Sequence, residues 1–200
     1  MFKRKFLIIL SSVFISISFS SCEKLEEVLP EKPSESTSTT YLIKKGQHSS
    51  TNRYAPLEVS KLVFTAVFDS SAIYKTGIQS NQADINKLYG ISDCGTHHHQ
   101  NSARFGWRWF NNQLEIHAYS YNDEQRKYEY ITSVALNKEY TYTIELKEDA
   151  YLFKINGKTV SSERSCSGKS SGYKLFPYFG GDEKAPHDIK VVIKDLPSSN

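Results

Sequence analysis

The stretch ARFGWRWFNNQLEIHAYSY, from Ala103 to Tyr121, decides the fold. Apolar and polar side chains alternate along both of its halves, and Asn111-Asn112 separates them. Successive side chains of a β-strand point to opposite faces, and a pair of turn-forming residues between two such strands is typical of a hairpin. The stretch therefore predicts two antiparallel strands, Ala103–Phe110 and Gln113–Tyr121, joined by a two-residue turn.

A turn at Asn111-Asn112 determines which residues face each other across this hairpin. One face then carries only apolar pairs, and we expect it to belong to a core between two packed sheets. These pairs are Trp109 with Leu114, Trp107 with Ile116, and Phe105 with Ala118.

The opposite face of the hairpin has an unusual composition for a solvated sheet surface. Arg108 faces Glu115, Gly106 faces His117 and Arg104 faces Tyr119, with Tyr121 beyond. Two arginines, a histidine and two tyrosines around a glycine favour the lining of a ligand groove, whereas Arg–Glu pairs alone also occur as ordinary surface decoration. We therefore take Arg104, Arg108, Glu115, His117, Tyr119 and Tyr121 as candidate ligand-binding residues.

The same alternation recurs along the chain and predicts an all-β protein. Asn156-Gly157 adds a second strong hairpin turn, and 13 Tyr and 11 Phe supply the ring area that strands favour. Ten or more strands in one domain imply two stacked antiparallel sheets. The further expected strands are Tyr41–Lys45, Ser60–Asp69, Lys87–Ser92, Lys127–Val134, Glu139–Leu146, Tyr151–Ile155, Lys158–Ser162, Gly172–Phe179 and Ile189–Leu196.

The order of the motifs resembles the concanavalin A-like lectin/glucanase jelly roll. The motifs are LYGISDCG, ARFGWRW, LEIHAYSY, NKEYTYTIELKEDAYLFKINGKTV and YKLFPYFGGDEKAPHDIKVVI. The resemblance covers most of residues 41–196 and implies a two-sheet antiparallel sandwich whose concave sheet is the ligand face. The family contains lectin modules, glucanases and polysaccharide lyases, so it implies a carbohydrate ligand without choosing an activity.

Residues 1–21 are typical of a signal peptide. Lys3, Arg4 and Lys5 precede an apolar run of about 14 residues, too short to cross the roughly 30 Å hydrocarbon core. Ser20-Ser21-Cys22 resembles the bacterial lipoprotein signal in a Bacteroidetes-type form, which implies lipidation of Cys22, for example with palmitate, and attachment to the outer membrane, facing the periplasm or the cell surface. The alternative is that Cys22 is simply the first cysteine of a secreted protein.

Residues 22–40 contain prolines, many Ser and Thr and no aromatic residue, and we expect a disordered tether there. A domain at 41–196 and a short tail at 197–200 follow. Of the 25 Lys and Arg, three lie within the signal peptide, and the remaining 22 equal the 22 Asp and Glu. The mature chain is therefore not a polycation, and its charge does not favour nucleic acid as a partner.

The loop DCGTHHHQ, from Asp93 to Gln100, is a candidate transition-metal site. In an extended chain His97 and His99 lie on the same side, so that with Asp93 or His187 they could ligate Zn²⁺ or Cu²⁺. The alternative is a polar loop whose histidines stack on their neighbours.

Cys94 and Cys166 are the only thiols besides Cys22, and in an exported chain they should form a disulfide. The acids of the segment GGDEKAPHD, Asp182 and Asp188 among them, are candidate Ca²⁺ ligands. Beyond these metals, we expect no cofactor.

A membrane-anchored, lectin-like glycan-binding module is the leading hypothesis. A glucanase of this fold would carry an E-x-D-x-E pattern on one strand, and Glu115 stands alone. The alternative is a lyase for uronate-containing glycans, with Arg108, His117 and Tyr119 as catalytic groups. The strings RFGWR, EIH and YKLFPYF faintly resemble the R-x-E-x-R, Q-I-H and Y-F-K-A-G-x-Y motifs of alginate-lyase-like jelly rolls, with Glu115 in place of Gln. A structural or protein-binding lipoprotein is the third hypothesis.

Overall fold

The computed structural model describes residues 37–51 and 55–197. These residues form twelve strands and two short 3₁₀ helices. Each predicted strand is present, with ends that differ by a few residues. The short strand β2 and the helices η1 and η2 were not predicted. The strands are β1 (Ser38–Ile43), β2 (Pro56–Leu57), β3 (Lys61–Phe68), β4 (Asn86–Ser92), β5 (Ser102–Phe110), β6 (Gln113–Asn122), β7 (Gln125–Val134), β8 (Tyr140–Leu146), β9 (Ala150–Ile155), β10 (Lys158–Glu163), β11 (Gly172–Leu175) and β12 (Ile189–Asp195); the helices are η1 (Ser70–Ala72) and η2 (Gln79–Ala83).

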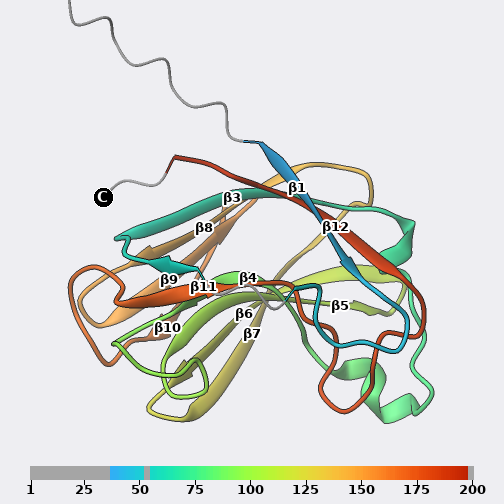
Figure 1. The fold of residues 1–200 in the computed structure, drawn as a ribbon, viewed down its shortest axis with the longest axis horizontal. Coiled ribbons are helices and arrows are strands. Elements are labelled where there is room, and N and C mark those ends of the chain that lie inside the picture. The colour runs from blue at the N-terminus through green and yellow to red at the C-terminus, as the bar shows by residue number, and fades with distance from the viewer. Residues whose placement is uncertain (1–36, 52–54, 198–200) are drawn as a thin grey trace, which may run out of the picture. The chain divides into compact units, whose positions relative to one another are not determined.

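The strands form two six-stranded antiparallel sheets. The first has the order β1-β12-β3-β8-β9-β10 and the second the order β2-β11-β4-β5-β6-β7. Figure 1 shows β1, β12, β3 and β8 in one layer and β4 to β7 in the layer beneath it. The predicted two-sheet antiparallel sandwich is therefore confirmed.

Aromatic side chains fill the space between the sheets. Phe64 of β3 stacks on Tyr142 of β8, with ring centroids 5.1 Å apart. Phe105 of β5 meets Tyr142 edge-on at 5.0 Å and Phe153 of β9 at 5.3 Å, so rings from both sheets interlock. Trp107 and Ile116, expected in the core from the hairpin pattern, are fully buried beside them.

The hairpin β5–β6 has the expected register. Trp107 pairs with Ile116, Arg108 with Glu115, and Gly106 with His117. The turn residues Asn111 and Asn112 have φ values of 49° and 58°, a left-handed conformation that asparagine tolerates better than most residues. This register places the core residues on one side and the candidate ligand-binding residues on the other.

Some predictions concern residues outside the described part of the chain. The signal peptide, the lipidated Cys22 and most of the tether fall there, whereas β1 already begins at Ser38, within the range assigned to the tether. Within the described ranges, we find no helix with the length and apolar character needed to cross a bilayer.

Candidate functional site

The face of the second sheet that points away from the first sheet carries the candidate site. It is defined here as the outer face, and its side chains are Lys87 of β4, Arg104 and Arg108 of β5, Glu115, His117, Tyr119 and Tyr121 of β6, and Tyr128 and Tyr130 of β7. All six predicted ligand-binding residues are among them. The outer face is not a solvated surface, because Arg104 is 7% exposed and His117 only 2%.

Glu115 holds two of these side chains together. Its Oε2 accepts a hydrogen bond from Arg108 Nε at 2.6 Å and lies 3.1 Å from His117 Nε2. Arg108 Nη1 also donates to the carbonyl oxygen of Ala83 at 2.7 Å. Burial lowers the pKa of His117, although the hydrogen bond with Glu115 acts in the opposite direction. A neutral His117 therefore donates from Nε2 to Glu115, and its buried Nδ1 has no partner among the described residues.

Arg104 is a buried cation with no acidic partner in the described part of the chain. Its Nη2 donates to the carbonyl oxygen of Phe176 at 2.9 Å, while its Nε has no hydrogen bond. Burial lowers the pKa of Arg104 to about 10, so the guanidinium is still charged at neutral pH. Burial likewise raises the pKa of Tyr119, which faces Arg104 across the hairpin, to about 12. The centre of the outer face is thus positive and holds unused hydrogen-bonding capacity.

Lys87 adds a second cation that the sequence analysis did not single out. Its Nζ donates to the carbonyl oxygen of Gly180 at 2.9 Å and lies 5.2 Å from the ring centroid of Tyr119. Burial, followed by repulsion from Arg104 and Arg126, lowers the pKa of Lys87 to about 8. Lys87 and Tyr119 line a hollow of about 70 Å³ with Ala83, Asp84, Ile85, Arg126, Tyr128 and Gly181.

Two exposed tyrosines complete the outer face. Tyr128 is 55% exposed and Tyr130 is 49% exposed, and their ring centroids lie 6.4 Å and 5.7 Å from that of the buried His117. They lie on β7, the last strand of the sheet. The outer face therefore has a buried polar floor and an accessible aromatic edge.

These tyrosines were not among the predicted site residues, because the turn between β6 and β7 has a weak sequence signal. That turn is Asp123-Glu124, with φ values of 47° and 66°; Asp123 is typical of such turns, but Glu124 stands where glycine is usual. With this turn, Tyr128 pairs with Tyr119 and Tyr130 with His117. One sequence signal could have revealed them: Tyr128 and Tyr130 alternate with other residues in a strand that was predicted, and so lie on the same face of it.

The solved structures that resemble this one share little sequence with the chain. An alginate lyase, AlyC3, is 12% identical with a TM-score of 0.48 over 78% of this chain and 72% of its own. A lichenase from a mouse hindgut metagenome is 8% identical with a TM-score of 0.45 over 80% of each chain. Galectin-1-L2 of Dario rerio is 12% identical with a TM-score of 0.42 over 81% of this chain and 100% of its own.

The two-sheet antiparallel sandwich expected from the strand pattern is the fold of the chain, and its narrower assignment to the concanavalin A-like jelly roll stays a prediction. At identities and TM-scores this low, the likenesses carry nothing about superfamily, ligand or reaction. The sequence matches no protein-family model and no curated protein.

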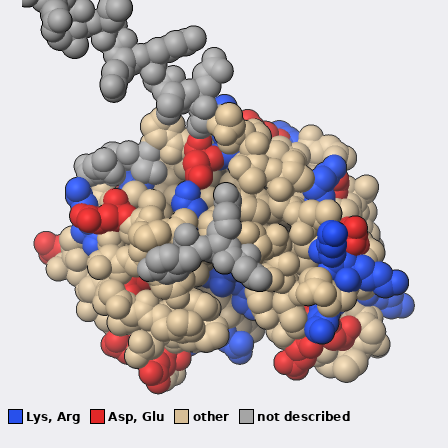
Figure 2. Space-filling view, in the orientation of Figure 1, with Lys and Arg blue, Asp and Glu red and all other residues tan. Residues whose placement is uncertain are grey.

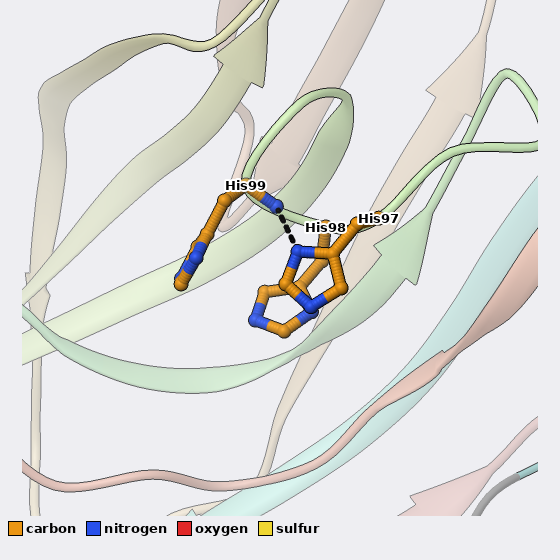
Figure 3. Close-up of side chains that lie close together, drawn as sticks. All are labelled: His97, His98 and His99. Carbon is orange, nitrogen blue, oxygen red and sulfur yellow. Dashed lines mark hydrogen bonds between the residues drawn. The ribbon is translucent and has the colours of Figure 1, made fainter.

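The histidines of the 93–100 loop lie beyond one end of the outer face, in a turn. Gln100 N donates to the carbonyl oxygen of His97 at 2.8 Å, and this bend replaces the extended chain assumed from the sequence. The bend brings His98 to the same side as His97 and His99, as Figure 3 shows. The ring of His99 lies 5.3 Å from that of Tyr121.

Asp93 and His187, the further metal ligands predicted for this loop, are engaged in other contacts. Asp93 is buried and accepts hydrogen bonds from Tyr151, Arg164 and the backbone of Ser171. His187 is hydrogen-bonded to the carbonyl oxygen of Ser71. The disulfide between Cys94 and Cys166 is present, which confirms that prediction.

The candidate Ca²⁺ ligands lie in the loop before β12. Asp188 Oδ1 accepts a hydrogen bond from the backbone of Lys45 at 2.8 Å, and Asp182 is exposed. Neither belongs to a group of three potential metal ligands within the described ranges. The Ca²⁺ site stays a prediction.

Proposed function

We propose that the protein is a lectin-like module that binds a glycan on the outer face of its second sheet. The observation that carries this proposal is the pair of exposed rings, Tyr128 and Tyr130, beside a buried polar floor. Tyrosine rings stack on the apolar faces of sugars, and a few fixed polar groups beside them orient the hydroxyls. Arg104, Lys87 and the Arg108–Glu115 pair supply such groups.

The charge of this floor favours an acidic glycan. Arg104 and Arg126 both repel the charge of Lys87, and Asp84 is the acid that attracts it. A sugar carboxylate or sulfate would offset this excess of positive charge. This preference for acidic glycans concerns the floor of the outer face alone. Figure 2 shows Lys and Arg interspersed with Asp and Glu over the visible face of the molecule.

We also propose that the protein is attached to the bacterial outer membrane. A lipid on Cys22 would hold the module at the bacterial outer membrane, since several acyl chains anchor a protein stably where one does not. The residues concerned lie outside the described part of the chain, so the support here is the sequence pattern alone.

The geometry favours binding over the alternative lyase activity. Arg108 is already engaged by Glu115 and by the carbonyl of Ala83, and His117 and Tyr119 are both buried. A base must come within hydrogen-bonding distance of the proton that it removes. The three groups would have to be freed and uncovered before they could act on a uronate.

Replacing Tyr128 and Tyr130 together with alanine is expected to weaken glycan binding at least tenfold. Each ring would lose its stacking energy, and about 1.4 kcal/mol corresponds to a tenfold change in affinity. A glycan array with the full-length protein would identify the ligand, and calorimetry would measure both affinities.

The matched control is the Tyr128→Phe, Tyr130→Phe variant, which keeps both rings and should bind within a few-fold of the wild type. Equal binding by the alanine variant, or no binding to any glycan, would contradict the proposal. Release of unsaturated uronate by the wild type, abolished by His117→Ala, would instead establish the lyase.

The affinity for an acidic oligosaccharide is expected to fall as the pH rises through about 8, the pKa of Lys87. Lys87 is charged below that value and loses its proton above it, so the attraction is present at low pH and lost at high pH. The neighbouring groups Arg104 and Tyr119 have pKa values of about 10 and about 12, so both keep their protonation states through this range. Calorimetry at about pH 7 and about pH 9 would measure the change.

Lys87→Arg is the control for this titration, because arginine keeps its charge at both pH values. Its affinity should be nearly independent of pH over the same range. A fall of equal size in Lys87→Arg would show that another group is responsible.

A further inference from the structure

The three histidines of the 97–99 turn form a cluster of ring nitrogens. One ligand atom from each of His97, His98 and His99 lies within 4.8 Å of the others. The ring centroids are 4.1 Å apart for His97 and His98, 4.3 Å for His98 and His99, and 5.1 Å for His97 and His99. We propose that these three imidazoles bind one divalent transition-metal ion of the Zn²⁺ or Cu²⁺ class.

The distances suit such an ion with little movement. Zn–N bonds of about 2.0–2.1 Å place the nitrogens of a tetrahedral site about 3.3 Å apart. The nitrogens must therefore approach one another by at most about 1.5 Å, and His97 and His99 are exposed and can change rotamer. Neutral imidazole is a preferred ligand of these metals, and three ligands leave a position open for water or an added ligand.

The middle ligand is already oriented by a hydrogen bond. His98 Nδ1 lies 2.9 Å from the hydroxyl of Tyr173 on β11, which also accepts a hydrogen bond from His98 N. When Nδ1–H donates to this oxygen, Nε2 is the unprotonated nitrogen that a metal requires. Outer partners of this kind determine the tautomer and ring orientation of metal-binding histidines.

The turn is held at both ends. The disulfide of Cys94 and the hydrogen bond from Gly95 N to the carbonyl of Ser171 fix its start. Ser102 Oγ, at the start of β5, donates to the carbonyl oxygen of His98 at 2.7 Å and fixes its end. The backbone therefore does not need to be ordered when the ion binds, which removes one cost of forming the site.

The test is equilibrium dialysis of the full-length protein, without a polyhistidine tag, against Zn²⁺ in the micromolar range. We expect one bound ion per chain, with affinity reduced at least tenfold in each of His97→Ala, His98→Ala and His99→Ala. The control is His187→Ala, a histidine outside the cluster, which should bind as the wild type does.

Two outcomes would overturn the proposal: no Zn²⁺ or Cu²⁺ bound by the wild type, or binding that the three alanine variants leave unchanged. Circular dichroism of the metal-free variants would verify that they are folded. Electron paramagnetic resonance of the Cu²⁺ complex supplies an independent measurement, because its nitrogen hyperfine pattern should weaken in each cluster variant and not in His187→Ala.

Discussion

Replacing Arg164 with methionine should lower the free energy of unfolding by about 3–5 kcal/mol, because it leaves a buried carboxylate unpaired. Arg164 Nε donates to Asp93 Oδ2 at 2.8 Å, and both side chains are fully buried. Tyr151 donates to the same oxygen at 2.9 Å and cannot replace the lost charge. Urea denaturation would measure the change.

The matched control is Lys127→Met, which breaks the exposed ion pair between Lys127 and Glu163. Its side chains are 50% and 68% exposed, and such surface pairs contribute about 0–1 kcal/mol. A similar small loss in Arg164→Met would mean that the buried pair is not essential. Adding Asp93→Asn to Arg164→Met removes the unpaired charge and should recover part of the stability.

The second large effect is expected for the double variant Cys94→Ala, Cys166→Ala. The disulfide closes a segment with a sequence separation of 72 residues, which corresponds to about 4 kcal/mol in the chain-entropy account of the unfolded state. Its loss should therefore lower the unfolding free energy by a comparable amount, again measured in urea.

Single Cys94→Ala serves as the comparison, since it removes the same bond and leaves one thiol. Both variants should be less stable than the oxidised wild type by the same amount, and the wild type should approach them under reducing conditions. A wild type unaffected by complete reduction would contradict the prediction. Because Asp93 directly precedes Cys94 and Arg164 lies two residues before Cys166, we expect the ion-pair and disulfide effects to be non-additive.

Much of this architecture could be predicted because its signals are local. The alternation of Ala103–Phe110 and Gln113–Tyr121 and the asparagine turn together determine the β5–β6 register. The disulfide followed from counting thiols. These features depend on neighbouring residues, where periodicity and turn chemistry act directly.

The rest depends on contacts between distant residues. No residue close to Lys87 in the sequence indicates that Gly180, Tyr119 and Arg126 will lie around it in the fold. The bend at His97–His99 requires a hydrogen bond that an extended chain lacks, and β11 ends at Leu175, before Pro177, which has no N–H to donate. The turn at Asp123-Glu124 is stabilised from outside, since Glu124 N donates to the carbonyl of Gln100. Tertiary contacts of this kind have no signature in a single sequence.

The order of strands in the first sheet constrains when the chain can fold. Strand β12 lies between β1 and β3, pairing with both, although it is the last strand in the sequence. A nascent chain that ends before Ile189 would leave β1 without its partner and one edge of β3 open. The complete first sheet therefore cannot form until synthesis has passed Asp195, because β12 joins strands that are far from it in the sequence.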